Sequence, residues 1–154
     1  MQEKLDLKSM SFAQVRALCD SLGFPAFRAG QIFAWCGRGI TAFSEMTDLN
    51  KADRAALQAK TCLTPCKIAE KFVSTLDGTA KYLIKLQNGY TVEAVVMRYR
   101  YGLSACLSTQ AGCRMGCAFC ASTVNGLGRN LSAGEILDQY LLLSKDQGER
   151  IGSV

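Results

Sequence analysis

Apolar residues in the first sixty positions recur at steps of three and four, the spacing of one helix face. After Ser11, which can cap a helix, apolar side chains follow at this spacing until Gly23, which can end it. A second helix is predicted over about 26–37 and a third over about 50–60. Short helices in this order predict a compact bundle. The apolar positions of the first helix are Phe12, Val15, Leu18, Cys19 and Leu22.

From Lys67 the apolar pattern changes to a period of two, which is typical of strands with one buried face. An Asp-Gly pair at 77–78 and an Asn-Gly pair at 88–89 interrupt it, and both dipeptides are strong signals for tight hairpin turns. The pattern therefore predicts an antiparallel meander of three strands. The predicted strands are 68–76, 81–86 and 91–99.

A fourth apolar run, at 103–107, leads into a cluster of cysteines and then into another helix. Ser132 and Glu135 form the sequence signature of a capping box, which predicts a helix over 133–145. The residues 151–154 look like the start of a further strand. A strand that begins there and stops would have nothing to pair with, so we expect the chain to be an N-terminal fragment.

Together these patterns predict an α+β N-terminal region, consisting of a small helical bundle plus an antiparallel β-meander, followed by a first βα unit. We expect the residues 1–66 to form a helical accessory domain. The residues 67–100 would form a β-hairpin connecting region, and 101–154 the incomplete start of a further domain.

The composition is that of an ordinary globular protein of 154 residues, 49% hydrophobic and 20% charged. No apolar stretch reaches the roughly eighteen residues of a membrane span, and the N-terminus lacks the layout of a signal peptide. We therefore expect a cytoplasmic protein. The net charge of +5 is compatible with a polyanionic partner. Histidine is absent from the sequence, which excludes catalytic triads with histidine and zinc sites that need an imidazole.

Eight cysteines without an export signal indicate a metal or redox site rather than a disulfide scaffold, and only one group of them is tightly spaced. Cys113, Cys117 and Cys120 follow the pattern Cx3Cx2C. Three thiolates on one loop can hold three irons of a [4Fe–4S] cubane and leave the fourth iron open. A structural zinc site is the alternative, but its fourth ligand would have to be a more distant cysteine.

Longer motifs surround these cysteines. The run 106–123 (CLSTQAGCRMGCAFCAST) and the run 126–136 (GLGRNLSAGEI) closely resemble the RlmN/Cfr family of radical S-adenosylmethionine (SAM) RNA adenine methyltransferases. Phe119, directly before the last cysteine, is typical of radical SAM loops. Family-like motifs also occur upstream, so the resemblance covers nearly the whole chain. The upstream motifs lie at 27–35, 43–49, 77–82 and 92–96.

The resemblance implies a radical SAM partial (β/α) barrel, of which the strand, cysteine loop and helix would be the first unit. Cys113, Cys117 and Cys120 would hold the [4Fe–4S] cluster. SAM would chelate the open iron and be cleaved there to a 5′-deoxyadenosyl radical. Binding of the cluster and of SAM is thus the cofactor chemistry that this resemblance implies.

Two further residues match functional positions of the family. Cys106 matches a cysteine that resolves the protein–RNA adduct by forming a disulfide with a methyl-carrying cysteine near the C-terminus. Glu93 matches the family's proposed proton acceptor. Burial among apolar neighbours would make this carboxyl a better proton acceptor. From the alternation of the strand alone, Glu93 would be a solvent-facing residue.

The function implied by the resemblance is methylation of C2 of adenine in 23S ribosomal RNA, and also in transfer RNA, through a methyl-cysteine intermediate. An electron donor such as flavodoxin or ferredoxin would be a partner of a monomeric enzyme that needs no membrane. A Cfr-like C8 methyltransferase and a non-catalytic RNA-binding or iron–sulfur module are the alternatives. The family's later motifs lie beyond Val154, so we expect this chain alone to be inactive.

Several basic and aromatic residues are candidates for contacts with RNA near the active site, and solvated surface charge is the alternative for each. They are Arg98, Arg100, Arg114 and Arg129, interleaved with Tyr99 and Tyr101, and Lys51, Arg54 and Lys60 on the third helix. The cysteines outside the motif are expected to be packing residues. These are Cys19, Cys36, Cys62 and Cys66.

Overall fold

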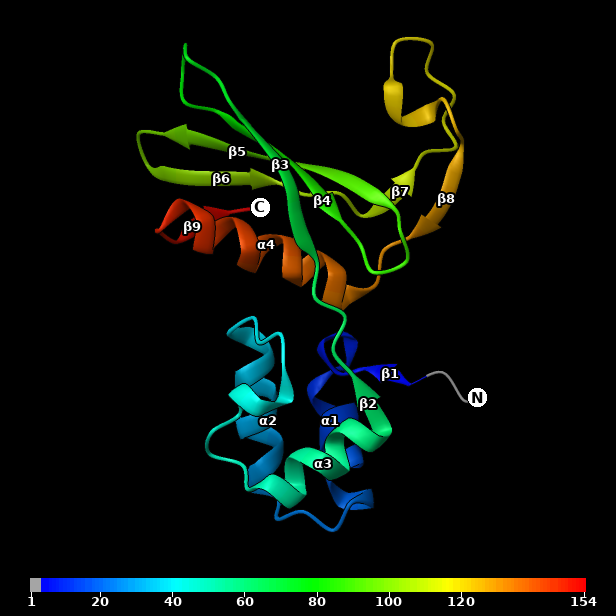
Figure 1. Ribbon diagram of the computed structural model, residues 1–154. Helices are drawn as coiled ribbons and strands as arrows, with labels where there is room; N and C mark the ends of the chain where they lie inside the picture. The colour runs from blue at the N-terminus through cyan, green and yellow to red at the C-terminus, as the bar shows by residue number, and fades with distance from the viewer. Residues whose placement is uncertain (1–3) are drawn as a thin grey trace. The chain divides into compact units, whose positions relative to one another are not determined.

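The computed structural model describes residues 4–154, and the chain divides into two compact units. The first unit extends to Pro65 and the second begins at Cys66 (Figure 1). Each unit has its own hydrophobic core. Residues 1–3, which the predicted helical domain includes, lie outside the described residues. No helix between residues 4 and 154 is long and apolar enough to cross a membrane.

The first unit is helical, as the three- and four-residue apolar spacing predicts. Ser11 caps α1 by accepting a hydrogen bond from the Gln14 amide, and Asn50 caps α3 by accepting one from the Asp53 amide. Gly23 takes a φ of 70° just after α1, the left-handed conformation that glycine adopts without strain. The helices are α1 (Phe12–Ser21), α2 (Phe27–Gly37) and α3 (Lys51–Lys60), with the 3-10 turns η1 (Leu7–Ser9) and η2 (Phe43–Glu45).

A short parallel strand pair joins the two ends of this unit. β1 (Leu5–Asp6) lies beside β2 (Thr61–Cys62), and Leu5 is paired with Thr61. The apolar pattern does not predict either strand, because two residues are too few to show a period. The helices bury Cys19 and Cys36 in their core, which confirms that these two cysteines are packing residues.

The second unit is built on a sheet of five strands among the described residues, in the order β3-β4-β5-β6-β9. The first four strands form an antiparallel meander, one strand longer than predicted, and Gly78 and Gly89 have positive φ in its predicted turns. The strands are β3 (Lys67–Val73), β4 (Ala80–Lys85), β5 (Thr91–Tyr99), β6 (Gly102–Cys106) and β9 (Ile151–Ser153).

The structure corrects one expectation about the last strand. β9 does have a partner, because it pairs in parallel with β6, and Ile151 lies opposite Leu103. The helix α4 (Ala133–Gln147) makes the crossover between the two strands, and the predicted capping box of Ser132 and Glu135 starts it. The α+β class is therefore confirmed. The described residues form one β-α-β unit, and the partial barrel remains a prediction.

α4 packs against one face of this sheet, as Figure 1 shows, and the strands alternate accordingly. Along β5, Val92, Ala94 and Val96 are buried, and the residues between them point to the opposite face. We call this opposite side the open face of the sheet. It carries both Glu93 and Cys106, because Cys106 is paired with Val95, two residues from Glu93 on the same face.

A third small sheet holds the cysteine loop. β7 (Gln110–Gly112) pairs antiparallel with β8 (Leu127–Asn130), and the residues between them form an excursion that includes the 3-10 turn η3 (Ala121–Thr123). Figure 1 shows this loop projecting from the end of the sheet where β7 and β8 lie. Neither strand was predicted.

Candidate functional site

The base of the cysteine loop is closed by two glycines. The Cys113 amide donates a hydrogen bond to the Gly126 carbonyl oxygen at 3.0 Å. Gly112 has a φ of 81°, and a Cβ atom on it would lie 2.0 Å from the Gly126 oxygen. A side chain at position 112 is therefore excluded both by the backbone conformation and by the close approach of the second strand.

Hydrogen bonds within the loop order its second half. The Cys120 amide donates to the Cys117 carbonyl at 3.1 Å, and the Thr123 hydroxyl donates to the carbonyls of Cys120 at 2.8 Å and Cys117 at 3.2 Å. Cys113, Cys117 and Cys120 are free, partly exposed thiols on this one loop. Phe119 is 94% exposed, so its ring is not packed against the rest of the loop.

The loop carries the three predicted cluster ligands, but the structure does not bring their thiols together. Among residues 4–154, no group of three or more cysteine, histidine, aspartate or glutamate side chains lies close enough together to hold a metal ion. The donor set still suits a cubane cluster, because three accessible thiols on one short loop can each bind one iron and leave one iron open. Their role as cluster ligands remains a prediction.

The two predicted catalytic residues lie on the open face at the same end of the sheet as β7. Cys106 ends β6 and is an exposed free thiol. Its register partner is Val95, so Glu93 is its diagonal neighbour, at a Cβ separation of about 7 Å for such a pair. The strands thus bring a thiol and a carboxylate together on one surface, and the roles expected for them remain predictions.

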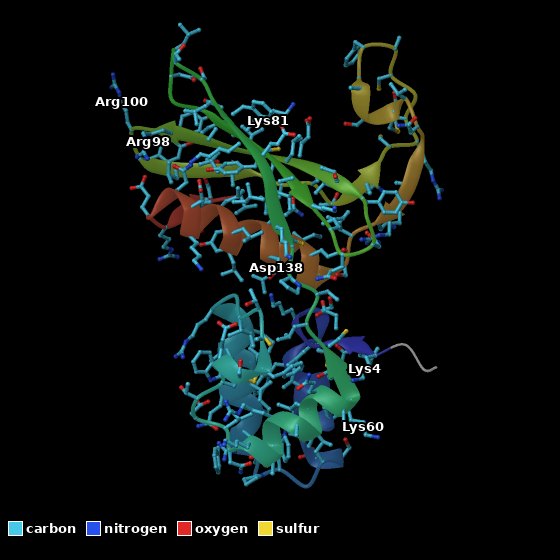
Figure 2. The ribbon with its side chains drawn as sticks, viewed as in Figure 1. Lys4, Lys60, Lys81, Arg98, Arg100 and Asp138 are labelled. Carbon is cyan, nitrogen blue, oxygen red and sulfur yellow. The ribbon has the colours of Figure 1, made fainter. Side chains whose placement is uncertain are left out.

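The surroundings of Glu93 differ from the apolar site that its sequence neighbours suggested. Its side chain is 57% exposed and forms an ion pair with Lys81 at 2.6 Å, between the Glu93 Oε1 and the Lys81 Nζ. Figure 2 shows Lys81 on β4, the strand next to it. Val92 and Ala94 are buried on the other face of the sheet, so they do not desolvate this carboxylate. The solvent-facing position that the alternation indicated is the correct one.

A cleft of about 590 Å³ joins Glu93 to the cysteine loop. Its volume lies within the range of small-molecule sites. One wall is the start of β5, another is the segment that follows Cys106, and the third is the loop after Cys120. The lining residues include Tyr90, Glu93, Ser108, Gln110, Ser122, Asn125 and Gly128.

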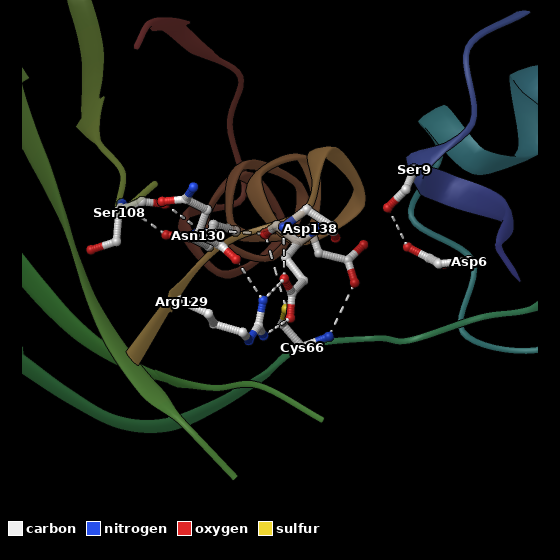
Figure 3. Close-up of polar contacts among 10 residues, drawn as sticks. Asp6, Ser9, Cys66, Ser108, Arg129, Asn130 and Asp138 are labelled. Atoms are coloured by element: carbon white, nitrogen blue, oxygen red, sulfur yellow. Dashed lines mark hydrogen bonds and ion pairs between the residues drawn. The ribbon is translucent and has the colours of Figure 1, made fainter. Parts of the chain in front are cut away.

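A buried glutamine of α4 fixes the segment between Cys106 and the cysteine loop. Gln139 is fully buried; its Oε1 accepts a hydrogen bond from the Ser108 amide at 3.0 Å and its Nε2 donates to the Ser108 carbonyl at 2.9 Å. The Ser108 hydroxyl in turn donates to the Glu93 carbonyl oxygen at 2.6 Å. Figure 3 shows Ser108 and the hydrogen bonds that connect it to the helix. Ser108 therefore links α4 to the backbone of β5.

A second contact from α4 fixes β8. Both terminal nitrogens of Arg129 donate to the Glu135 carboxylate, which also accepts from the Ser132 amide at 2.9 Å (Figure 3). These hydrogen bonds, the one from Arg129 above all, hold the pKa of Glu135 below its usual range although burial opposes the shift. One helix therefore fixes β8 and the segment that leads into β7.

Sequence reasoning missed this polar face of α4. Glu135, Asp138 and Gln139 are buried polar residues of one helix, and Asp138 accepts a hydrogen bond from the Cys66 amide at 3.0 Å. Cys66 is buried beside them, as its expected packing role requires, and Cys62 is half-buried. The spacing of these residues in the sequence could have revealed this face, because Asp138 and Gln139 lie three and four positions after Glu135 and such positions share one helix face. Polar residues on the face that packs against a sheet indicate buried hydrogen bonds.

The candidate RNA-contacting residues of the second unit are not all gathered around the site, although Arg114 lies within the cysteine loop. Arg98, Tyr99 and Arg100 lie at the β5–β6 turn, and Tyr99 is six residues, or about 20 Å, from Glu93 along the strand. Arg129 is held by Glu135, as described above. In the first unit, Arg54 donates a hydrogen bond to the Ser44 carbonyl at 2.8 Å. The expectation that the arginines and tyrosines of this turn lie near the active site is therefore wrong.

Comparison with known proteins agrees with this fold. Residues 5–63 match the family described as ribosomal RNA large subunit methyltransferase N-terminal domain. Two relatives described as probable dual-specificity RNA methyltransferase RlmN are 49% identical in Alkaliphilus metalliredigens and 47% identical in Alkaliphilus oremlandii. Each match extends over 152 residues, which are 99% of this chain and 43% and 44% of those proteins.

A solved structure is also similar. A radical SAM methyltransferase from Sphaerobacter thermophilus superposes with a TM-score of 0.81 and 35% sequence identity, over 96% of this chain and 44% of that one. The chain therefore spans less than half the length of the proteins that it matches. By sequence over nearly its whole length, and by fold, the chain is similar to RlmN proteins, as its cysteine run and upstream motifs predict.

Proposed function

We propose that the chain provides the cluster loop and part of the RNA-facing surface of a radical SAM methyltransferase that methylates C2 of adenine in 23S ribosomal RNA and in transfer RNA. The observation that carries the proposal is the placement of the cysteine loop beside a cleft that also contains Glu93. The names of the relatives support an RNA substrate. In this proposal the enzyme is a cytoplasmic monomer that receives electrons from a flavodoxin or ferredoxin.

Cys113, Cys117 and Cys120 would hold the [4Fe–4S] cluster as thiolates. The cluster, together with SAM, supplies the radical chemistry of this enzyme class. The hydrogen bond between the Cys113 amide and the Gly126 oxygen keeps the loop attached to the β7–β8 pair. The protein's contribution at this point is to orient the loop toward the cleft.

Cys106 and Glu93 would act on the RNA adduct from the open face. Methylation would proceed through a methyl-cysteine outside the described residues. The Cys106 thiolate would attack the sulfur of that cysteine in the adduct, so that a disulfide forms while the carbon–sulfur bond to the RNA breaks and the carbon leaves with the electron pair. A thiol needs access for this reaction, and Cys106 is exposed. The Glu93 carboxylate would accept the proton that the RNA adduct loses. Lys81 at 2.6 Å orients this carboxylate over the open face.

The test is anaerobic reconstitution of the chain with iron and sulfide, followed by measurement of the cluster absorption band and of the iron content. We expect a [4Fe–4S] cluster in the chain and in Cys62→Ala, which removes a cysteine of the first unit. Cys117→Ala should lose the cluster. Cys106→Ala should retain it, because Cys106 is assigned to the RNA adduct. Bound zinc, or equal iron in the Cys117→Ala variant, would contradict the proposal.

A further inference from the structure

The turn between β5 and β6 presents two stacked tyrosines to solvent. The ring centroids of Tyr99 and Tyr101 are 5.1 Å apart and their planes differ by 6°. Tyr99 is 45% exposed and Tyr101 is 76% exposed. Gly102 takes the positive φ that reverses the chain, at 120°, so both tyrosines keep ordinary backbone conformations.

This arrangement leaves aromatic surface available for a planar ligand. Each ring covers one face of the other, and the exposed fractions show that much of both rings remains in contact with water. A protein usually buries aromatic rings in a core or an interface, because they carry a large apolar surface. Nucleic-acid bases stack on such rings irrespective of their sequence.

Arginines lie on both sides of Tyr99. Arg98 forms an ion pair with Glu149 at 2.6 Å, which fixes its side chain beside the end of α4. Arg100 is exposed, and Figure 2 shows its side chain extending outward from the turn. An exposed guanidinium next to stacked rings offers a phosphate contact beside a base platform.

The tyrosines and the candidate catalytic residues share the open face. Glu93, Val95, Met97 and Tyr99 alternate along β5 with the buried residues that face α4. The distance along the strand, about 20 Å, is too long for one nucleotide to contact both Glu93 and Tyr99. A strand of several nucleotides can contact both.

We propose that Tyr99, Tyr101 and Arg100 form a second contact for single-stranded RNA, at the end of the open face remote from Glu93. The proposal rests on the proposed function, since it takes RNA as the substrate class. It assigns base stacking to the two tyrosines and phosphate binding to Arg100. The contact holds nucleotides that flank the reacting adenine and does not take part in the chemistry.

Two features favour RNA over a protein partner at this turn. Arg98 and Arg100 flank Tyr99 in the chain, and the chain carries a net charge of +5. A protein interface would need a wider buried apolar centre around the tyrosines. Binding of a protein, including a second copy of this chain, is therefore an alternative that the experiment must detect.

The experiment measures binding of a fluorescein-labelled single-stranded RNA of mixed sequence, about twelve nucleotides long, to the full chain by fluorescence anisotropy. The double variant Tyr99→Leu with Tyr101→Leu keeps apolar side chains but removes the flat rings. We expect it to weaken binding by about tenfold or more, the effect of one lost stacking contact. The matched control, Tyr99→Phe with Tyr101→Phe, keeps the rings and should bind within about twofold of the parent chain.

Salt dependence tests the role of Arg100 separately. Arg100→Gln should reduce the magnitude of the negative slope of the logarithm of affinity against the logarithm of salt concentration by about 0.7, as expected for one lost phosphate contact. Equal affinities of the leucine and phenylalanine double variants would overturn the stacking assignment. So would a parent chain that does not bind the RNA, or tyrosine-dependent self-association in gel filtration. Cluster content, measured in every variant, should stay unchanged and distinguishes failure of this inference from failure of the proposed function.

Discussion

The hydrogen bonds between Gln139 and Ser108 give the sharpest prediction about how the site is held. The change Gln139→Leu replaces a buried amide with an apolar side chain of similar size. It removes the acceptor for the Ser108 amide at 3.0 Å and the donor to the Ser108 carbonyl at 2.9 Å. A leucine side chain cannot form hydrogen bonds, so the amide and the carbonyl of Ser108 both lose their partner.

The size of the effect follows from these two bonds. A net loss of about 1 kcal/mol is expected for each neutral hydrogen bond, and about 1–3 kcal/mol for each backbone group left buried without a partner. Ser108 is only half-buried, so water can reach part of its backbone. The burial of the apolar leucine side chain offsets a further part of the lost stability. We therefore expect a loss of about 2–3 kcal/mol in the stability of the second unit.

Native-state hydrogen exchange is the appropriate assay because it reads individual amides. The Ser108 amide should be protected in the parent chain and exchange freely in Gln139→Leu. A matched control is Gln147→Leu on the same helix, which removes only the hydrogen bond from Gln147 to the Tyr82 hydroxyl at 2.6 Å. It should lose about 1 kcal/mol and leave Ser108 protected. Unchanged protection of Ser108 in Gln139→Leu would refute the reasoning.

Three shorter predictions concern neighbouring features. The pKa of Glu135 is lowered in the folded state, so its ionised carboxylate stabilises the fold above its ordinary pKa, and this stabilisation is lost as the pH falls through the lower folded value. The free energy of unfolding of Glu135→Gln, measured against pH, should therefore lack this loss in acid. Gly112→Ala should abolish cluster uptake, whereas Gly116→Ala, which has a similar positive φ but open space around it, should reduce it only slightly; equal loss in both would refute the steric argument. Burial raises the pKa of the Cys19 thiol, with a smaller effect of Asp20, so iodoacetamide should modify Cys19 far more slowly than the exposed Cys106, as measured by mass spectrometry.

Local signals in the sequence predicted the elements that local interactions stabilise. The Ser11 cap and Gly23 correctly predict the ends of α1. The hairpin turn at Gly78 could be predicted because its positive φ favours glycine. The capping box at Ser132 is also present as predicted. In each case the stabilising contact joins residues within a few positions of each other, so a short window of sequence contains it.

Elements that depend on distant contacts could not be predicted in this way. β7 and β8 have three and four residues, and they exist because Gly112 allows the Gly126 carbonyl to approach. The pairing of β9 with β6 depends on the packing of α4 against the sheet. No apolar period marks strands of this length, since the period needs at least four or five residues to appear.

The candidate site shows the difference between neighbours in sequence and neighbours in space. Val92 and Ala94 adjoin Glu93 in the chain, but the pleat places them on the opposite face, so the carboxylate is exposed and paired with Lys81. Cys106 is thirteen residues away in the sequence and is its diagonal neighbour on the open face. The pairing register, which the motifs alone do not contain, decides which groups can cooperate.

Two kinds of contact therefore fix Glu93, and they differ in strength. The ion pair with Lys81 is exposed, and such pairs contribute little to stability, so it orients the side chain without restricting the strand. The backbone of Glu93 is paired with Leu83 in the sheet and also accepts a hydrogen bond from the Ser108 hydroxyl, and Ser108 is held by the buried amide of Gln139. Because the same segment follows Cys106 directly, movement of α4 would displace the thiol and the carboxylate together. A buried glutamine outside every recognised motif thus contributes to the position of both proposed catalytic groups.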